Sequence, residues 1–134
     1  MGQVSIPVSV GELVDKMTIL EIKAERIADP GKLENVIKEL ELVRGIWNSS
    51  SYATADIEHA RARLKAVNEA LWDIEDEIRL LEAERRFDEK FVELARAVYL
   101  KNDERAALKR EISTLLDSEV VEEKSYSEYT RKEI

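Results

Sequence analysis

The residues with the clearest potential for chemistry lie near the C-terminal end of the chain. Five of them are spaced three, four, three and four residues apart, so they would share one face of a continuous helix: Tyr99, Asn102, Ala106, Lys109 and Ser113. A small alanine between a phenol, an amide and a cation would leave a shallow polar notch. A carboxylate or a phosphate could bind there, because neighbouring cations would supply positive charge. The predicted ligand-binding residues are Tyr99, Asn102, Arg105, Lys109 and Arg110.

The same segment allows a purely structural interpretation. Asn102 and Asp103 are good N-cap residues, so one helix could end at residue 101 and another could begin at residue 103. The shared face would then not exist, and Arg105 and Arg110 would only pair with nearby acids. We favour this interpretation, because helix caps and surface ion pairs are commoner than binding sites.

This chain lacks the residues that most catalytic mechanisms need. There is no cysteine, a single histidine (His59), no G-x-S-x-G nucleophile motif and no glycine-rich phosphate loop. No catalytic residue can be assigned and no cofactor is predicted, so an enzyme is the less favoured interpretation. With one histidine and no thiol, only carboxylates could bind a metal.

Two all-α enzyme classes stay open as alternatives. Mg-dependent pyrophosphatases hold their metal between acids on facing helices, and the acids available here are Glu12, Asp15, Asp73, Asp76, Glu77 and Glu84. Asp73, Glu77 and Glu84 lie opposite the apolar seam of their helix and would face water, so no metal site is predicted. Chorismate-mutase-like enzymes clamp a dicarboxylate with cations, for which the chain offers Arg61, Arg63, Lys65 and Arg79. Such cations are also common beside a coiled-coil seam.

The charge balance argues against polyanionic partners. The 134 residues carry 21 basic and 29 acidic side chains, a net charge of −8. An acidic surface repels phosphates, so binding to nucleic acid or to an anionic membrane is not expected. The first ten residues lack the basic start and apolar run of a secretory signal, which predicts a cytoplasmic location.

Hydrophobic periodicity predicts an all-α fold in a single domain spanning residues 1–134, built as an elongated helical hairpin or bundle. The N-terminal arm alternates apolar and polar residues, which is typical of extended chain. The predicted segments are an extended arm at 1–8, helices at 9–28, 30–48, 54–86, 88–101 and 103–117, and a loosely ordered tail at 119–134.

The helix predicted at 54–86 carries the strongest pattern. Two apolar series recur every seven residues, as in a coiled coil: Ile57, Leu64, Leu71 and Ile78, with Ala60, Val67, Ile74 and Leu81 between them. The pattern fails at Arg85 and Asp88, which predicts a bend or break near Arg86.

Two features predict a symmetric homodimer. An unbroken helix over 54–86 would be about 50 Å long, whereas a compact chain of this size is about 36 Å across. The helix at 9–28 has apolar residues on both sides, with Ile19 and Ile22 opposite the main stripe, so it must be covered twice. A two-fold dimer would provide cover without a second gene product.

Three segments together resemble a family of small bacterial and phage proteins known only as a domain of unknown function. They are residues 7–27, residues 64–79 and residues 91–116, and the most specific part is the run YLKNDERAALKR at 99–110. The resemblance covers nearly the whole chain. It implies no established activity, so no catalytic role carries over to these residues.

The sequence therefore predicts a non-catalytic, homo-oligomeric helical scaffold or regulatory protein, a homodimer with a possible protein partner. The alternative is an all-α enzyme or a small-anion binder with a site between helices. The positions of Lys16, Asn68 and Asn102 separate the two hypotheses. Convergence in one pocket would favour a ligand site, and separate exposure to water would favour an interaction protein.

Overall fold

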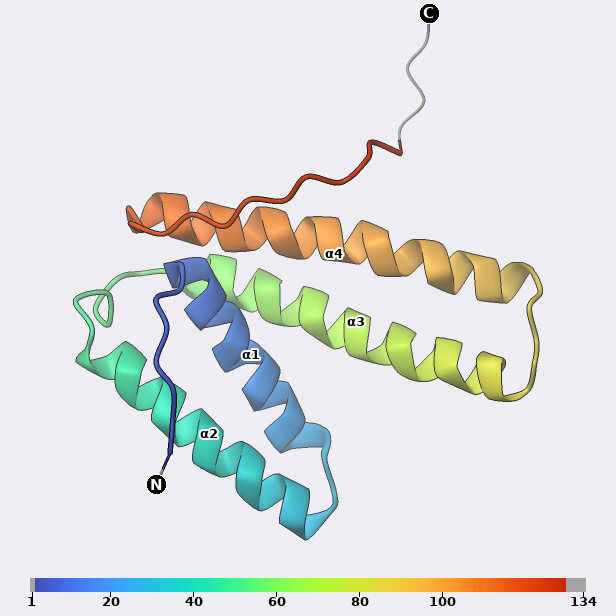
Figure 1. The fold of residues 1–134 in the computed structure, drawn as a ribbon, viewed down its shortest axis with the longest axis horizontal. Helices are drawn as coiled ribbons and strands as arrows, with labels where there is room; N and C mark the ends of the chain where they lie inside the picture. Colours follow the sequence, from blue (N-terminus) through green and yellow to red (C-terminus); the bar gives the residue numbers. More distant parts are fainter. Residues whose placement is uncertain (1, 130–134) are drawn as a thin grey trace, which may run out of the picture.

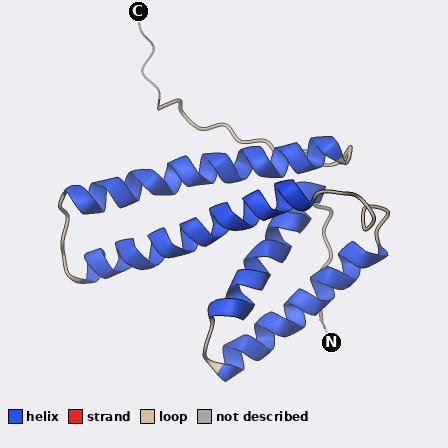
Figure 2. Ribbon diagram, turned by 180° about the vertical axis from the view of Figure 1, so that it is seen from behind, coloured by secondary structure: helices blue, strands red, loops and turns tan. Residues whose placement is uncertain are grey.

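The computed structural model describes residues 2–129, and within them the chain forms helices and no strand (Figures 1 and 2). This confirms the predicted all-α class. The helices are α1 (Val10–Arg26), α2 (Pro30–Ser49), α3 (Glu58–Ala83) and α4 (Glu89–Leu115). No helix in the described part of the chain is long and apolar enough to cross a membrane.

Side-chain caps begin three of the four helices. The Ser9 hydroxyl accepts a hydrogen bond from the Glu12 amide at 3.1 Å, and the Asp29 carboxylate accepts one from the Lys32 amide at 2.9 Å. The Asp88 carboxylate accepts one from the Phe91 amide at 3.2 Å. Each cap satisfies an amide that has no partner within its helix, which fixes where the helix starts.

The helices form two hairpins that diverge from a common end (Figure 1). α1 packs against α2, α3 and α4, whereas α2 packs against α1 alone among the described elements. α3 and α4 lie side by side along their whole length (Figures 1 and 2). α1 is therefore the central helix, and Ile22 on its second apolar side is fully buried, as its two-sided pattern predicts.

Two apolar clusters hold the hairpins together. The first lies where α1, α3 and α4 meet and consists of Val10, Val14, Ile57, Ala60, Leu64, Val67, Leu108 and Ile112. The second lies between α1 and α2 and consists of Met17, Leu20, Val36, Leu40 and Val43. The first cluster therefore lies where the two hairpins converge, and the second lies within the α1–α2 hairpin.

The helices predicted at 88–101 and 103–117 are a single helix in the structure. α4 runs without interruption from Glu89 to Leu115, so the interpretation of Asn102 and Asp103 as a helix cap is wrong. The apolar side chains of Leu94, Leu108 and Ile112 are buried on both sides of the expected break. Their packing against neighbouring helices outweighs the local capping preference of two polar residues.

The helix predicted at 54–86 is shorter at both ends. Residues 50–57 form turns in which the Tyr52 ring stacks on Trp47, with ring centroids 6.5 Å apart. At the other end, the Arg86 amide bonds back to the Leu81 carbonyl at 2.9 Å and Arg85 has a φ of 54°, which is a Schellman stop. The interruption predicted near Arg86 is therefore a tight turn between α3 and α4.

The segments before α1 and after α4 differ in their contacts with the helices. Residues 2–8 of the predicted extended arm are exposed and form no strand. Residues 119–129 of the predicted loose tail run extended beside α4, here named the C-terminal strap (Figure 1). The remaining tail residues, 130–134, lie outside the described residues, as does Met1.

Candidate functional site

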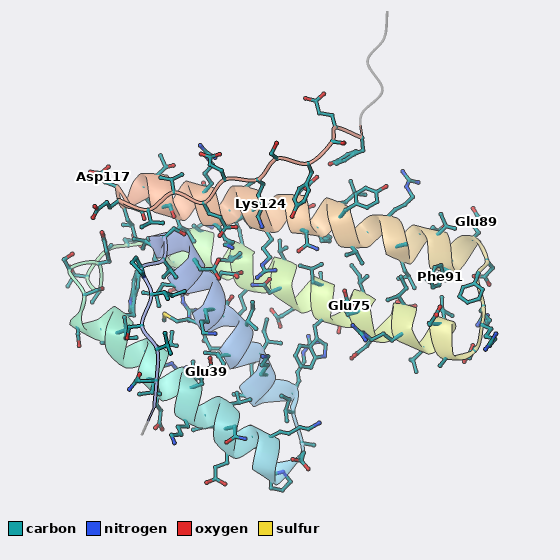
Figure 3. All side chains as sticks on the ribbon, viewed as in Figure 1. Glu39, Glu75, Glu89, Phe91, Asp117 and Lys124 are labelled. Carbon is teal, nitrogen blue, oxygen red and sulfur yellow. The ribbon has the colours of Figure 1, made fainter. Side chains whose placement is uncertain are left out.

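A cleft of about 1000 Å³ separates the C-terminal strap from α4. Four of the five predicted ligand-binding residues line it: Tyr99, Asn102, Arg105 and Lys109. The continuous helix places these residues on one face, as the three-and-four spacing requires. The strap forms the opposite wall with Glu122, Lys124, Tyr126, Ser127, Glu128 and Tyr129, and Figure 3 shows Lys124 where the strap passes over α4.

Arg110, the fifth predicted residue, lies outside this cleft. Its guanidinium binds the Glu123 carboxylate at 3.0 Å, and both side chains are exposed. One residue along a helix turns the side chain by about 100°, so Arg110 cannot share the face of Lys109. Arg110 fastens the strap from the side and does not contribute to the cleft.

Two side-chain contacts attach the strap to α4 on either side of the cleft. Glu122 is bound to Lys109 at one end, and the Tyr129 ring packs on Tyr99 at the other, with centroids 5.4 Å apart. The cleft lies between these two attachments, with α4 as one wall and the strap as the other.

Arg105 forms the most buried ion pair of the described residues. Its Nε and Nη2 donate to the two Asp15 oxygens at 3.0 and 2.5 Å, and Asp15 is only 1% exposed. The Asn68 amide donates to Asp15 at 2.9 Å and to the Thr18 hydroxyl at 3.0 Å. The hydrogen bond to Asp15 raises the pKa of Arg105. One buried polar cluster thus joins α1, α3 and α4.

Lys109 lies between two carboxylates. Its ammonium is 2.5 Å from Glu12 on α1 and 3.1 Å from Glu122 on the strap. Burial alone would lower the pKa of Lys109, but the hydrogen bonds with Glu12 and Glu122 outweigh burial and raise it. Lys109 therefore stays charged and holds the strap against the rest of the molecule.

These ion pairs give the acids of α1 and the cations of α4 a structural role. Glu12 and Asp15, considered above as possible metal ligands, instead bind Lys109 and Arg105, which are four residues apart on α4. Glu12 and Asp15 are three residues apart on α1, and a spacing of three or four residues places two side chains on one face of a helix. The two acids on α1 can therefore face the two cations on α4. The predicted anion-binding cations are thus neutralised within the protein.

The residues of the two enzyme alternatives are dispersed. Among the described residues, no group of histidines and acids is arranged to hold a metal ion. The cations considered for a dicarboxylate clamp pair with acids: Arg61 with Glu21, Lys65 with Glu25, Arg63 with Glu111 and Arg79 with Glu75. Arg61 and Lys65 both approach Glu21, whereas Arg63 and Arg79 pair with other acids, so the four cations do not form a common clamp.

One comparison with known proteins identifies a family for this chain. The model of a family described as a family of unknown function (DUF6165) matches residues 4–131, almost the whole chain. The chain belongs to this family. No curated protein and no protein of solved structure matches it significantly. Membership in the family assigns no activity, so the functional argument rests on the geometry of the site.

We expect acid to release the strap from α4. Hydrogen bonds from Lys124 and Lys109 lower the pKa of Glu122 to about 2 from the ordinary value of 4.5. Because the pKa is depressed in the folded state, this contact stabilises the strap fully above about pH 4.5 and is lost as the pH falls from 4.5 towards 2. An NMR titration of the Glu122 carboxyl carbon checks the midpoint.

The lysine variants control this titration. Lys124→Met should move the Glu122 midpoint up towards 4.5, whereas Lys101→Met should not, because Lys101 binds Glu104 instead. A wild-type midpoint already near 4.5 would show that the strap is not held by these ion pairs.

Proposed function

We propose that this protein is a cytoplasmic, non-catalytic interaction protein that works as a homodimer. The observation that carries the proposal is the half of the α3–α4 hairpin that extends beyond α1. Neither apolar cluster includes any residue between positions 72 and 107. A pair of helices with no third layer buries too little apolar surface to be stable alone, so this half needs a partner.

The distal half of the hairpin has the composition of an interface. Only Leu81 and Leu94 are buried there among the apolar side chains. Half-buried apolar side chains lie on both helices, at positions Trp72, Ile74, Ile78, Phe91 and Val98. Phe87 and Val92 are exposed by more than half, and Figure 3 shows Phe91 beside the turn between the helices. Patches of this kind are typical of protein interaction sites.

The seven-residue repeat supports a second copy as the partner. Leu64 and Val67 are buried against α1 and α4, whereas Ile74 and Ile78, later in the same repeat, are only half-buried. Two such hairpins packed face to face make a four-helix bundle, the arrangement that heptad-like spacing favours. The two-fold contact would cover the same patch on each subunit.

The three residues that separate the two hypotheses do not all meet in one pocket. Lys16 pairs with Glu39 of α2, Asn68 is buried in the polar cluster, and Asn102 lies exposed on α4. Asn68 and Asn102 both line a hollow between α1, α3 and α4, whereas Lys16 lies outside it, so the three residues do not all converge in one pocket. The cations of the candidate site are already paired, which gives no support to catalysis by an open charged group.

A matched pair of variants tests the dimer. Val92 is 52% exposed in a single chain and Leu115, at the opposite end of α4, is 61% exposed. Val92→Glu should raise the dimer dissociation constant at least tenfold, because it places a charge in an apolar interface. Leu115→Glu should leave it unchanged. The melting temperature of the wild type should rise with protein concentration.

A dissociation constant that responds equally to both variants would contradict the assignment of this interface. A melting temperature independent of concentration for the wild type would contradict the dimer itself.

A further inference from the structure

The cleft beside the strap has two chemically different ends. At one end, Lys109 lies between Glu12 and Glu122. At the other end, Tyr99 and Tyr129 pack against each other and leave 43% and 58% of their surfaces exposed. Tyr126 joins them on the strap and is 76% exposed. Three exposed phenol rings in one cleft are a costly arrangement for a surface without a ligand.

The tyrosine end carries negative charge. Asp103 lines the cleft there and accepts a hydrogen bond from the Tyr129 hydroxyl, which raises the pKa of that phenol. Within the described part of the chain, no cation lies within ion-pair distance of Asp103. Glu128 is a second carboxylate in the same lining.

Among the described residues, the charge balance of the cleft disfavours an anion as the ligand. Its lining contains four carboxylates and three cations, and each of the three cations is already bound to a carboxylate: Arg105 to Asp15, and Lys109 and Lys124 to Glu122. A phosphate or carboxylate would have to displace an internal partner, and it would meet further acids at the tyrosine end. A positively charged ligand meets no such cost.

We propose that the tyrosine end of this cleft binds an organic ammonium ion, with Tyr99, Tyr126 and Tyr129 facing the cation and Asp103 balancing its charge. An ammonium group is attracted to the negative face of an aromatic ring, and several rings together form the cages that recognise quaternary ammonium groups. Tyr126 lines the same cleft and is largely exposed, so its ring is accessible to a ligand there. A volume of about 1000 Å³ admits a small organic molecule.

An NMR titration of the full-length protein with choline tests this site. A few cation–π contacts predict a dissociation constant in the millimolar range, with shifts of the amides around Tyr99 and Asp103. The neutral isostere 3,3-dimethylbutan-1-ol should bind at least tenfold more weakly, because only the charge differs. Inorganic phosphate should not shift these amides.

Paired variants locate the contacts. Tyr99→Ala should weaken choline binding about tenfold and Tyr99→Phe should retain it, since the ring and not the hydroxyl faces the cation. Asp103→Asn should weaken it several-fold, whereas Glu104→Gln, which changes the neighbouring acid outside the cleft, should not. The far-UV spectrum and melting temperature of each variant confirm that it is folded.

Three results would overturn the proposal. Equal binding of the alcohol and choline would make the cleft an apolar pocket. Phosphate binding in preference to choline would make it an anion site, the less favoured of the two interpretations of the sequence pattern. The absence of any choline-induced shift would leave the tyrosines as attachments of the strap only.

Discussion

Replacing Arg105 with alanine is expected to lower the free energy of unfolding by about 3 kcal/mol. Asp15 is 1% exposed, and both of its carboxylate oxygens accept a hydrogen bond from this guanidinium. Removing one partner of a buried ion pair leaves an uncompensated charge, which costs about 3–5 kcal/mol. We expect the lower end of that range, because the cleft beside Arg105 would admit water to Asp15.

Chemical denaturation of three variants measures this effect. Arg110→Ala is the matched control, since Arg110 pairs with exposed Glu123 and its loss should cost far less than the loss of Arg105. Adding Asp15→Asn to Arg105→Ala should recover part of the stability, because an amide needs no counter-charge. A loss below about 1 kcal/mol for Arg105→Ala would show that the buried pair does not hold α4 to α1.

Gly11→Ala is expected to destabilise the protein by about 3 kcal/mol, the upper end of the usual cost of overpacking. A Cβ atom at Gly11 would lie 2.0 Å from the Lys109 carbonyl oxygen and 2.8 Å from the Ser113 hydroxyl. The nearest atom belongs to the backbone of α4, so no flexible side chain can move aside. α1 and α4 would have to separate, which breaks the 2.9 Å hydrogen bond from the Gly11 amide to Ser113.

Gly45→Ala is the matched control in another helix. Nothing lies within 4 Å of a Cβ atom at Gly45, so this change should stabilise α2 by about 0.5–1 kcal/mol. Thermal denaturation of both variants compares the two glycines directly. Equal effects at the two positions would mean that α1 and α4 do not approach as closely as described.

The helices could be predicted because periodicity is a local property. The helices predicted at 9–28 and 30–48 are present and are capped by Ser9 and Asp29, and α1 is buried on both sides. Periodicity does not show what covers an apolar face. Ile74 and Leu64 belong to one repeat, yet only Leu64 lies under a third helix.

The candidate site could be predicted only in part. The spacing of Tyr99, Asn102 and Lys109 correctly places them on one face, provided that the helix is continuous. The local preference of Asn102 and Asp103 for a helix cap favours a break at this point, but the packing of the buried apolar side chains of α4 outweighs it. Sequence alone gave no sign that the strap would form the second wall, because its contacts join residues with no shared periodicity.

The buried ion pair of Asp15 and Arg105 could not be predicted from the sequence. The two residues are 90 positions apart, and each has several exposed residues of the same charge nearby. One signal was present: Asp15 lies beside Val14 and Thr18 on a helix with apolar residues on both sides. An acid on a helix that must be covered twice requires a cation from another element, and that requirement could have prompted a search for one.

Sedimentation equilibrium of the full chain at micromolar concentration tests the homodimer most directly. The uncovered distal half of the α3–α4 hairpin predicts a mass twice the 15.4 kDa of one chain, and Val92→Glu should shift the protein towards the single-chain mass. A wild-type mass of 15.4 kDa at that concentration would contradict the account, since the distal half of the hairpin would then be stable in water without a partner.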